Sequence, residues 1–549
     1  MEIRDLLYVI YCVWVVGMVF PFKAAFFAFT VPHALLSAIC GLAVCILSTV
    51  SKMEIPVYLL LFFAAEFGVF LLSRQFAWFE NYSRCMGYLF RSSVIFFAAL
   101  TNSIDYSIEL LAIPFVIAGC FEGCYVIYQK LVDSGKIKNR FNYEIKRSRY
   151  VGSIGNPNQV SEFLLITLVV TIYVSLSYPL ALLAIPFIIS GLVLTAGRAT
   201  LVSLAVGCLS VGIIYPLSLL VSIPVLSLAV WKMRERLDWH NVRLFFWKHI
   251  LRNKLKHPFR IEGINVIRFV DQLSNTELHK YTIFNPLDRS HNWFLDLFVE
   301  GGVLYFVTFL VASIASLFFL PSFLKVAMIM LLVNEFFSFP LHANYLLWAF
   351  LASVAVAGVP LPLWVLVPFI VYGVYLGIRA YLAGRVVGKK PDSFMDAYYR
   401  LRKGLELSKA VSPYFIDFLW MEGETFGENV IYELPRMGKI DPLHSGDFWA
   451  LCSLIIAEYG NDPETAREFV QLGFESDPAN IKLRRLVRYL DGDEKAFVQE
   501  LHDITREFMQ AYGKDQKQEE IFWKELIMNS PAKERYKERY EAEYFDRFN

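Results

Sequence analysis

Apolar residues occur along most of this chain in long blocks, separated by short polar segments. Between residues 6 and 383 the blocks have the length of membrane-spanning helices, roughly 17 to 25 residues, and contain few charges. We predict spanning helices at 6–22, 25–49, 55–73, 86–101, 107–128, 160–177, 179–196, 199–215, 216–231, 303–320, 322–339, 342–359 and 361–383. The expected fold class is therefore all-α, a polytopic transmembrane bundle of about 12 to 13 spans.

The composition agrees with a lipid environment. With 56% hydrophobic and 19% charged residues, the chain is too apolar for an ordinary soluble protein of 549 residues. A formal net charge of +1 provides no basic field, so nothing indicates nucleic acid as a partner. Charged residues become dense after residue 383, which predicts a transmembrane domain at 1–383 and a soluble helical domain at 384–549.

The charged C-terminal domain contains ordinary helix signals. Asp462 followed by Pro463 is a good N-cap and first-turn pair for a helix. Gly404, Gly438 and Gly473 recur at about the 34-residue period of tetratricopeptide helix pairs. A TPR-like repeat and an irregular helical domain both fit this pattern, and either is a candidate docking module for a protein partner.

A polar stretch of about 60 residues, 232–292, interrupts the apolar blocks. Each span moves the chain to the opposite face of the membrane, so nine preceding spans place this stretch opposite the N-terminus. The same parity places the loop at 130–158, Arg198 and the segment 339–344 on that face. We therefore predict that four polar segments converge there.

The orientation of that face has two interpretations. The loop at 130–158 is the most basic short loop in the chain, and the positive-inside rule would make it cytoplasmic. The alternative is that its basic residues lie outside because they meet an anionic ligand. The side of the C-terminal domain depends on the span count, since thirteen spans place it with His291 and twelve place it opposite.

The strongest local motif surrounds His291. Ser290 is a credible N-cap and the pair Gly301–Gly302 a credible stop, so a short helix is expected to begin at His291. In a first helical turn the backbone N–H groups and the helix dipole disfavour an imidazolium, which predicts a neutral, proton-accepting histidine and an anion site. The alternative is a surface histidine that caps an interfacial helix.

Two arginines extend the candidate site. Arg198 interrupts two apolar spans at their junction, where a charged group is costly and usually functional. Arg243 opens an amphipathic helix inside the polar stretch. Guanidinium groups bind phosphate oxygens bidentately and stay charged, so both are candidate phosphate ligands. The alternative for both side chains is snorkelling to the membrane interface.

Three carboxylates lie inside predicted spans, namely Glu66, Glu122 and Glu335. Functional residues and interhelical hydrogen bonding are both open interpretations for each of them. The first loop, around Lys23, carries no carboxylate of the kind that binds a divalent metal ion, so we expect no metal site.

In combination these motifs resemble the O-antigen ligase family of membrane glycosyltransferases. The resemblance covers roughly residues 150–345, where the motifs fall in family order, and the segment from His291–Asn292 to Glu300–Gly301–Gly302 is its most specific part. The other motifs are Gly155–Asn158, Gly197–Ala199, Arg243–Trp247 with Pro258 and Gly263 downstream, and Phe337–Leu341. Residues 1–150 match no family motif, Gly197 stands where serine is usual, and a charged C-terminal domain is not a general feature.

The resemblance implies a metal-independent transferase of the GT-C class, without a cofactor, in the plasma (inner) membrane with its site on the outer face. It implies that Arg198 and Arg243 hold a diphosphate and that His291 activates the acceptor hydroxyl. The residues implied in substrate binding are Asn156, Asn158, Arg289, Asn292 and Glu300. The implied partners are membrane lipid, a polyprenyl-diphosphate-linked glycan donor, and a glycan, lipid or protein acceptor.

Other functions share some of these features. A lipid-linked glycan polymerase would differ mainly in its acceptor, and the motifs do not separate it from a ligase. A polysaccharide transporter or flippase would also be polytopic, but its polar groups usually lie at the bilayer midplane on broken helices. A membrane-anchored scaffold that presents the C-terminal domain would not depend on His291.

Overall fold

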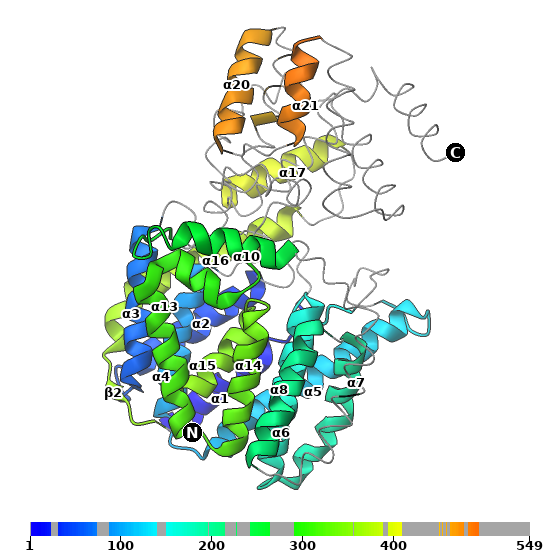
Figure 1. Cartoon of the computed structure of the whole chain (residues 1–549). Coiled ribbons are helices and arrows are strands. Elements are labelled where there is room, and N and C mark those ends of the chain that lie inside the picture. Colours follow the sequence, from blue (N-terminus) through cyan, green and yellow to red (C-terminus); the bar gives the residue numbers. More distant parts are fainter. Residues whose placement is uncertain are drawn as a thin grey trace. The chain divides into compact units, whose positions relative to one another are not determined.

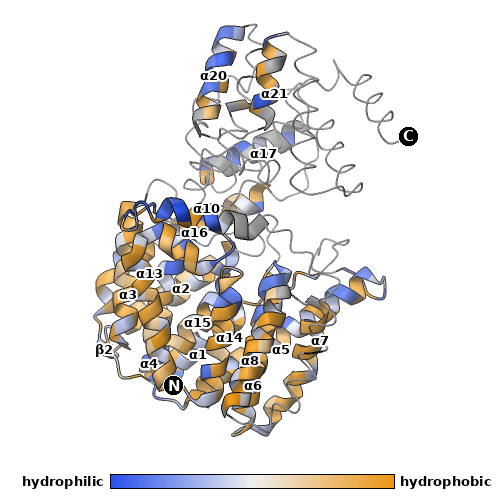
Figure 2. Ribbon diagram, viewed as in Figure 1, coloured by the Kyte–Doolittle hydropathy of each residue, from blue (hydrophilic) through white to orange (hydrophobic). Residues whose placement is uncertain are grey.

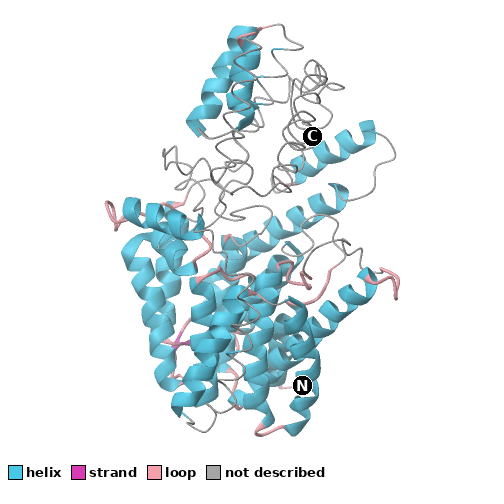
Figure 3. Ribbon diagram, turned by 45° about the vertical axis from the view of Figure 1, so that its right-hand side comes forward, coloured by secondary structure: helices cyan, strands magenta, loops and turns pink. Residues whose placement is uncertain are grey.

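The structure is a computed structural model that describes residues 2–22, 31–73, 87–139, 150–195, 197–214, 227, 242–263, 290–354, 356–387, 394–408, 449–450, 453, 457, 462–476 and 481–492. Figure 3 shows that these residues are almost entirely helical. The chain divides into two compact units. Unit 1 comprises Met1–Trp239, Lys254–Asn265 and Ser290–Asp392, and unit 2 comprises His240–Asn253, Val266–Arg289 and Ser393–Asn549.

The helices of unit 1 are labelled in Figure 1. Their bounds are α1 (Ile3–Gly17), α2 (Val31–Leu47), α3 (Val57–Leu72), α4 (Tyr88–Ser103), α5 (Ile108–Asp133), α6 (Pro157–Ser175), η1 (Pro179–Ala184), α7 (Ile185–Thr195), α8 (Arg198–Ile214), α13 (Trp293–Phe319), α14 (Ser322–Phe336), α15 (His342–Ser353), η4 (Leu363–Leu366) and α16 (Val367–Val387). A short antiparallel pair, β1 (Glu54–Ile55) with β2 (Val359–Pro360), joins the segments before α3 and η4.

These helices overlap the predicted spans within the described part of the chain, while the span predicted at 216–231 lies outside the described residues except for residue 227. Several bounds differ. Helix α1 ends at Gly17 and not at 22, α13 begins at Trp293 and not at 303, and α15 ends at Ser353 and not at 359. Helix α5 continues to Asp133, beyond the predicted end at 128, because Gln129 and Val132 are buried and tertiary contacts prolong the helix. The predicted border at Gly384 falls within the last turn of α16, which ends at Val387.

The chain is a membrane protein by the length and composition of its helices. Four described segments are long and apolar enough to cross a bilayer, namely Ile108–Asp133, Pro157–Ser175, Trp293–Phe319 and Leu363–Val387. Figure 2 shows that apolar residues predominate along the helices of unit 1. Large apolar side chains such as Ile213, Phe318 and Leu180 are 76% to 83% exposed, and lipid is the environment in which such exposure costs least.

Helix α15 forms the centre of unit 1. All 12 of its residues are buried, and it packs against α4, α6, α13 and α14. At 1.5 Å per residue it is about 18 Å long, too short to cross the hydrocarbon core alone. Its buried position makes it a scaffold on which the starts of α6 and α13 are held.

Unit 2 includes most of α10 (Val242–Lys254) and the helices α17 (Phe394–Leu407), α20 (Pro463–Ser476) and α21 (Ile481–Leu490). The predicted helix start at Asp462 is confirmed, because its carboxylate accepts hydrogen bonds from the Thr465 amide and hydroxyl at 3.1 and 2.6 Å. Helices α20 and α21 pack through Val470, Leu483 and Leu486. Gly438 lies outside the described residues, so the TPR-like repeat stays a prediction.

Candidate functional site

The start of α6 is held by a rigid turn. Residue Gly152 has a φ of 59°, and its amide donates to Gln129 Oε1 at 3.0 Å while Gln129 Nε2 donates to its carbonyl at 3.1 Å. The next residue, Ser153, donates its amide and hydroxyl to the carboxylate of Glu122. Glu122 is therefore a hydrogen-bonding residue inside the fold, but its partner lies in the turn before α6 and not in another helix. The turn is followed by Asn156, whose Oδ1 caps α6 by accepting a hydrogen bond from the Asn158 amide at 3.0 Å.

The junction at Gly197–Arg198 packs directly against this turn. A Cβ on Gly197 would lie 2.7 Å from Ser161 Oγ and 2.9 Å from Thr200 Oγ1, so a side chain at this position would require one of these hydroxyls to shift. The hydroxyls of Ser161 and Thr200 are 2.7 Å apart and join α6 to α8. Arg198 is the first residue of α8, next to Gly197.

The segment at 337–341 meets the same end of α6. The side-chain Nε2 of Gln159 donates to Ser338 Oγ at 2.6 Å. Its Oε1 accepts from the Leu341 amide at 3.3 Å and from Asn344 Nδ2 at 2.8 Å. All of these side chains are buried. Their hydrogen bonds to Gln159 therefore fix the turn before α15 against the first turn of α6.

His291 lies beside this turn, but not inside a helix. The N-cap of α13 is Asn292, whose Oδ1 accepts from the Leu295 amide at 3.0 Å. The predicted cap at Ser290 is wrong, because the Ser290 hydroxyl and amide instead donate to Asp296 Oδ1. His291 has a φ of 55°, which is unusual for a residue with a Cβ. Residues with such a backbone conformation occur most often at functional sites.

The imidazole of His291 contacts the segment at 337–341. Its ring centroid lies 5.5 Å from that of Phe339, with the planes tilted by 46°. We name 150–158, 197–198, 290–292 and 337–341 the four site segments. Asn158, Gln159 and Phe339 connect them in one continuous neighbourhood. The described ends of the four predicted polar segments thus lie close together, while their position on one face of the membrane stays a prediction.

The comparisons with known proteins add nothing to this geometry. No protein-family model matches the chain, and the searches of curated proteins and of solved structures returned no significant match. The resemblance to O-antigen ligases therefore rests on the motifs alone, and the function is argued below from the arrangement of the residues.

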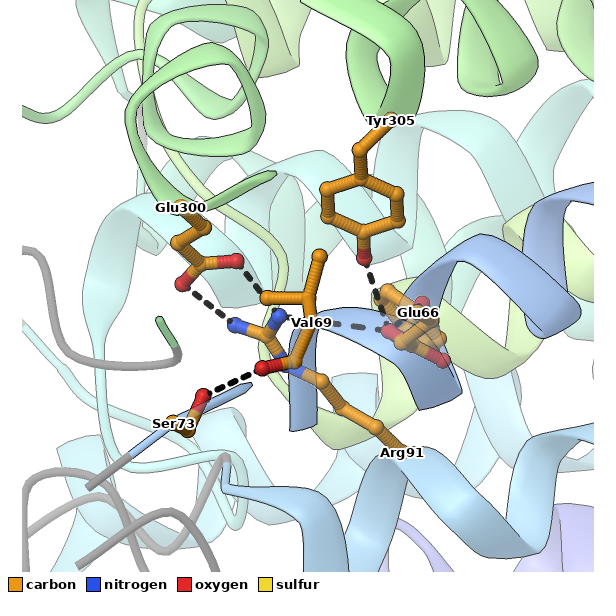
Figure 4. Close-up of polar contacts among 7 residues, drawn as sticks. Glu66, Val69, Ser73, Arg91, Glu300 and Tyr305 are labelled. Atoms are coloured by element: carbon orange, nitrogen blue, oxygen red, sulfur yellow. Dashed lines mark hydrogen bonds and ion pairs between the residues drawn. The ribbon is translucent and has the colours of Figure 1, made fainter. Parts of the chain in front are cut away.

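Glu300 has a structural partner that no local pattern predicted. Its carboxylate accepts two hydrogen bonds from Arg91, at 2.7 and 3.0 Å, and both side chains are almost completely buried. Figure 4 shows this pair beside Glu66, whose Oε1 lies 3.9 Å from Arg91 Nη1. Glu66 also accepts from the hydroxyls of Tyr305 and Tyr345 at 2.9 and 3.1 Å. For Glu66 too, interhelical hydrogen bonding is confirmed.

Arg91 is the residue that sequence reasoning missed. Its signal is a charged residue inside the predicted span 86–101, which by itself indicates a buried partner. The partner is 209 residues away, so the pairing could be found only from the fold. The interpretation of Glu300 as a substrate-binding residue stays a prediction, and the structure directs its carboxylate at Arg91.

The remaining candidates are placed less completely. Arg243 lies in α10, in unit 2, and Arg289 lies outside the described residues. Among the residues that the structure describes, no group of three or more His, Cys, Asp or Glu side chains is arranged to hold a metal ion. The donor groups gathered at the four site segments are neutral amides, hydroxyls and one imidazole, with the backbone of Arg198 adjacent.

Proposed function

We propose that this chain is a multi-pass membrane glycosyltransferase that moves a glycan from a polyprenyl-diphosphate carrier to an acceptor hydroxyl. The observation that carries the proposal is the convergence of the four site segments. They contain four of the five motifs on which the resemblance to O-antigen ligases rests, and they come from distant parts of the chain. Independent motifs of a single active site are expected to meet in space, whereas chance matches are not.

The chemistry assigned to this neighbourhood is a displacement at the anomeric carbon. The acceptor oxygen forms the new glycosidic bond, and the bond from the anomeric carbon to the diphosphate breaks. The polyprenyl diphosphate leaves with its negative charge, which the guanidinium group of Arg198 stabilises. The same role for Arg243 is what the resemblance implies. The acceptor hydroxyl gives up its proton to the imidazole of His291, which needs no metal ion for that role.

The asparagines suit sugar recognition at the same place. Asn156 and Asn292 each use the side-chain Oδ1 to cap a helix. The hydrogen bond from the backbone N–H to Oδ1 therefore fixes the position of each side-chain amide group. A helix N-terminus also presents N–H groups to anions. Helices α6 and α8 begin within the four site segments, and α13 begins directly after its N-cap Asn292. Three helix N-termini therefore lie at the site segments, which favours a diphosphate over a neutral ligand.

A transporter is the main alternative from another class, because α13 is interrupted at Gly302, as helices in transporters often are. The freed backbone groups of that interruption bond to residues 254–263 instead of facing a ligand. A glycan polymerase would use the same site and differ in its acceptor.

Arg198→Ala is expected to lower the rate of polyprenyl diphosphate release in isolated membranes by about a hundredfold, because it removes the positive charge that stabilises the leaving diphosphate. Arg198→Lys, which keeps the charge but not the bidentate geometry, is expected to retain part of the rate. Arg385→Ala is the matched control, since Arg385 is exposed in the last turn of α16. Full transfer by Arg198→Ala would exclude the proposed diphosphate site.

The site is proposed to lie on the outer face of the plasma membrane. In intact cells a cysteine at Lys138, which is exposed after α5, is expected to react with an impermeant thiol reagent. Parity places the opposite end of α6 on the inner face, so a cysteine at the exposed Ser177 is the control and is expected to react only after the cells are opened. The reverse pattern would place the site in the cytoplasm.

A further inference from the structure

Helix α13 is broken at Gly302, whose φ of 71° and ψ of −171° are far from helical values. The break separates a half-helix, Trp293–Gly301, from the apolar segment that follows. A Cβ on Gly302 would lie 2.9 Å from the carbonyl oxygen of Pro258, so only glycine fits this close approach. The predicted stop at the paired glycines is thus confirmed as an interruption.

A break of this kind frees backbone groups that a membrane protein must satisfy internally. The amide of Val303 would bond to the carbonyl of Val299 in a continuous helix, but here it donates to Pro258 O at 2.8 Å. The carbonyl of Glu300 is freed in the same way. It accepts from the amides of Glu262 and Gly263 at 3.0 and 2.9 Å.

The carbonyl of Val299 is satisfied by a side chain. The Nζ of Lys254 donates to it at 3.2 Å and also donates to the carbonyl of Arg260. Lys254 is only 1% exposed and lies 5.9 Å from the centre of the Phe298 ring. Burial lowers the pKa of this ammonium to about 8, against a smaller opposing effect of Glu262. A cation at the C-terminal end of a half-helix also interacts favourably with its dipole.

We propose that Lys254, with the segment 258–263, is a staple that fixes the half-helix Trp293–Gly301 and so positions His291 at its other end. Lys254 is a positioning residue, because its contacts are to backbone carbonyls and not to the four site segments. The half-helix is about 13 Å long, and its side is held separately by Glu300 and Arg91. With two braces the turn at His291 has little freedom to shift. The role in positioning rests on the proposed function.

The test compares Lys254→Met, which keeps the stem but loses the donor, with Lys254→Arg and with Lys256→Met. Lys256 is exposed two residues away and serves as the matched control. In the purified full chain, Lys254→Met is expected to lower kcat for glycan transfer by about a hundredfold, because a misplacement of about 1 Å has that effect. The KM for the donor is expected to change less than about twofold. Lys254→Arg is expected to recover part of kcat.

Amide hydrogen exchange gives a second result that does not need activity. The amides of Glu262, Gly263 and Val303 are expected to exchange slowly in the wild-type protein and in Lys256→Met, and faster in Lys254→Met. Equal exchange in Lys254→Met and Lys256→Met would overturn the staple. Faster exchange with an unchanged kcat would overturn the positioning role. If wild-type protein transfers no glycan, the proposed function fails, and the exchange data still decide the staple.

Discussion

His291→Ala is expected to lower glycan transfer by about 10²- to 10⁴-fold, the range that a positioned general base contributes. The imidazole is the one titratable side chain among the described residues of the four site segments apart from Arg198 and Tyr150. It lies beside Phe339, and its backbone is held in an unusual conformation by the Asn292 cap and the Ser290–Asp296 hydrogen bond. A positive φ at a histidine costs free energy. A catalytic requirement for the imidazole beside Phe339 explains why the protein keeps this backbone conformation.

The measurement is the rate of transfer from a lipid-linked donor, with the folded amount of each variant checked by size-exclusion chromatography. His291→Gln keeps a hydrogen-bonding group without a useful proton acceptor, and is expected to fall nearly as far as His291→Ala. His257→Ala is the control, because His257 is an exposed histidine elsewhere in the polar stretch. Wild-type rates in His291→Ala would assign the histidine to capping the start of α13 and nothing more.

Arg91→Met is expected to destabilise unit 1 by about 3 to 5 kcal/mol, because it leaves a buried carboxylate without its counter-charge. Glu300 accepts both of its short hydrogen bonds from Arg91 and is 0% exposed. Glu66 would lose the same cation, although Tyr305 and Tyr345 would still donate to it. The loss is larger than removal of a surface ion pair, which costs about 1 kcal/mol or less.

Thermal unfolding in detergent measures this effect. Arg91→Met is expected to unfold at a clearly lower temperature, whereas the double variant Arg91→Met with Glu300→Leu is expected to recover much of the loss by removing the unpaired charge. Arg252→Met, at an exposed arginine, is the matched control. Additive losses in the double variant would show that Arg91 and Glu300 stabilise the protein independently.

The helices of unit 1 could be predicted because their signal is local. A run of about 20 apolar residues is sufficient to indicate a buried or lipid-facing helix, whatever packs against it. Helix ends were less predictable. Ser290 and Asn292 are both good N-cap residues, and only the carboxylate of Asp296, which takes the Ser290 hydroxyl, decides in favour of Asn292.

The segments of the candidate site could be predicted from the sequence, but the contacts that hold these segments in place could not. Parity alone indicated that Arg198, His291 and the segments around Asn156 and Phe339 belong to one face. The Arg91–Glu300 pair and the Lys254 staple depend on contacts across the fold, and no periodic pattern reveals them. The packing of Gly197 against Ser161 likewise depends on how α6 and α8 meet, which no local pattern shows.

The most direct test of the central claim uses the purified chain in nanodiscs with a defined polyprenyl-diphosphate-linked glycan and a set of hydroxyl-bearing acceptors. The account predicts that polyprenyl diphosphate is released in step with new glycosidic product, that EDTA leaves the rate unchanged, and that His291→Ala lowers the rate by at least about a hundredfold. Intact donor after incubation with every acceptor, while the wild-type protein is folded and binds it, would contradict the assignment as a glycosyltransferase.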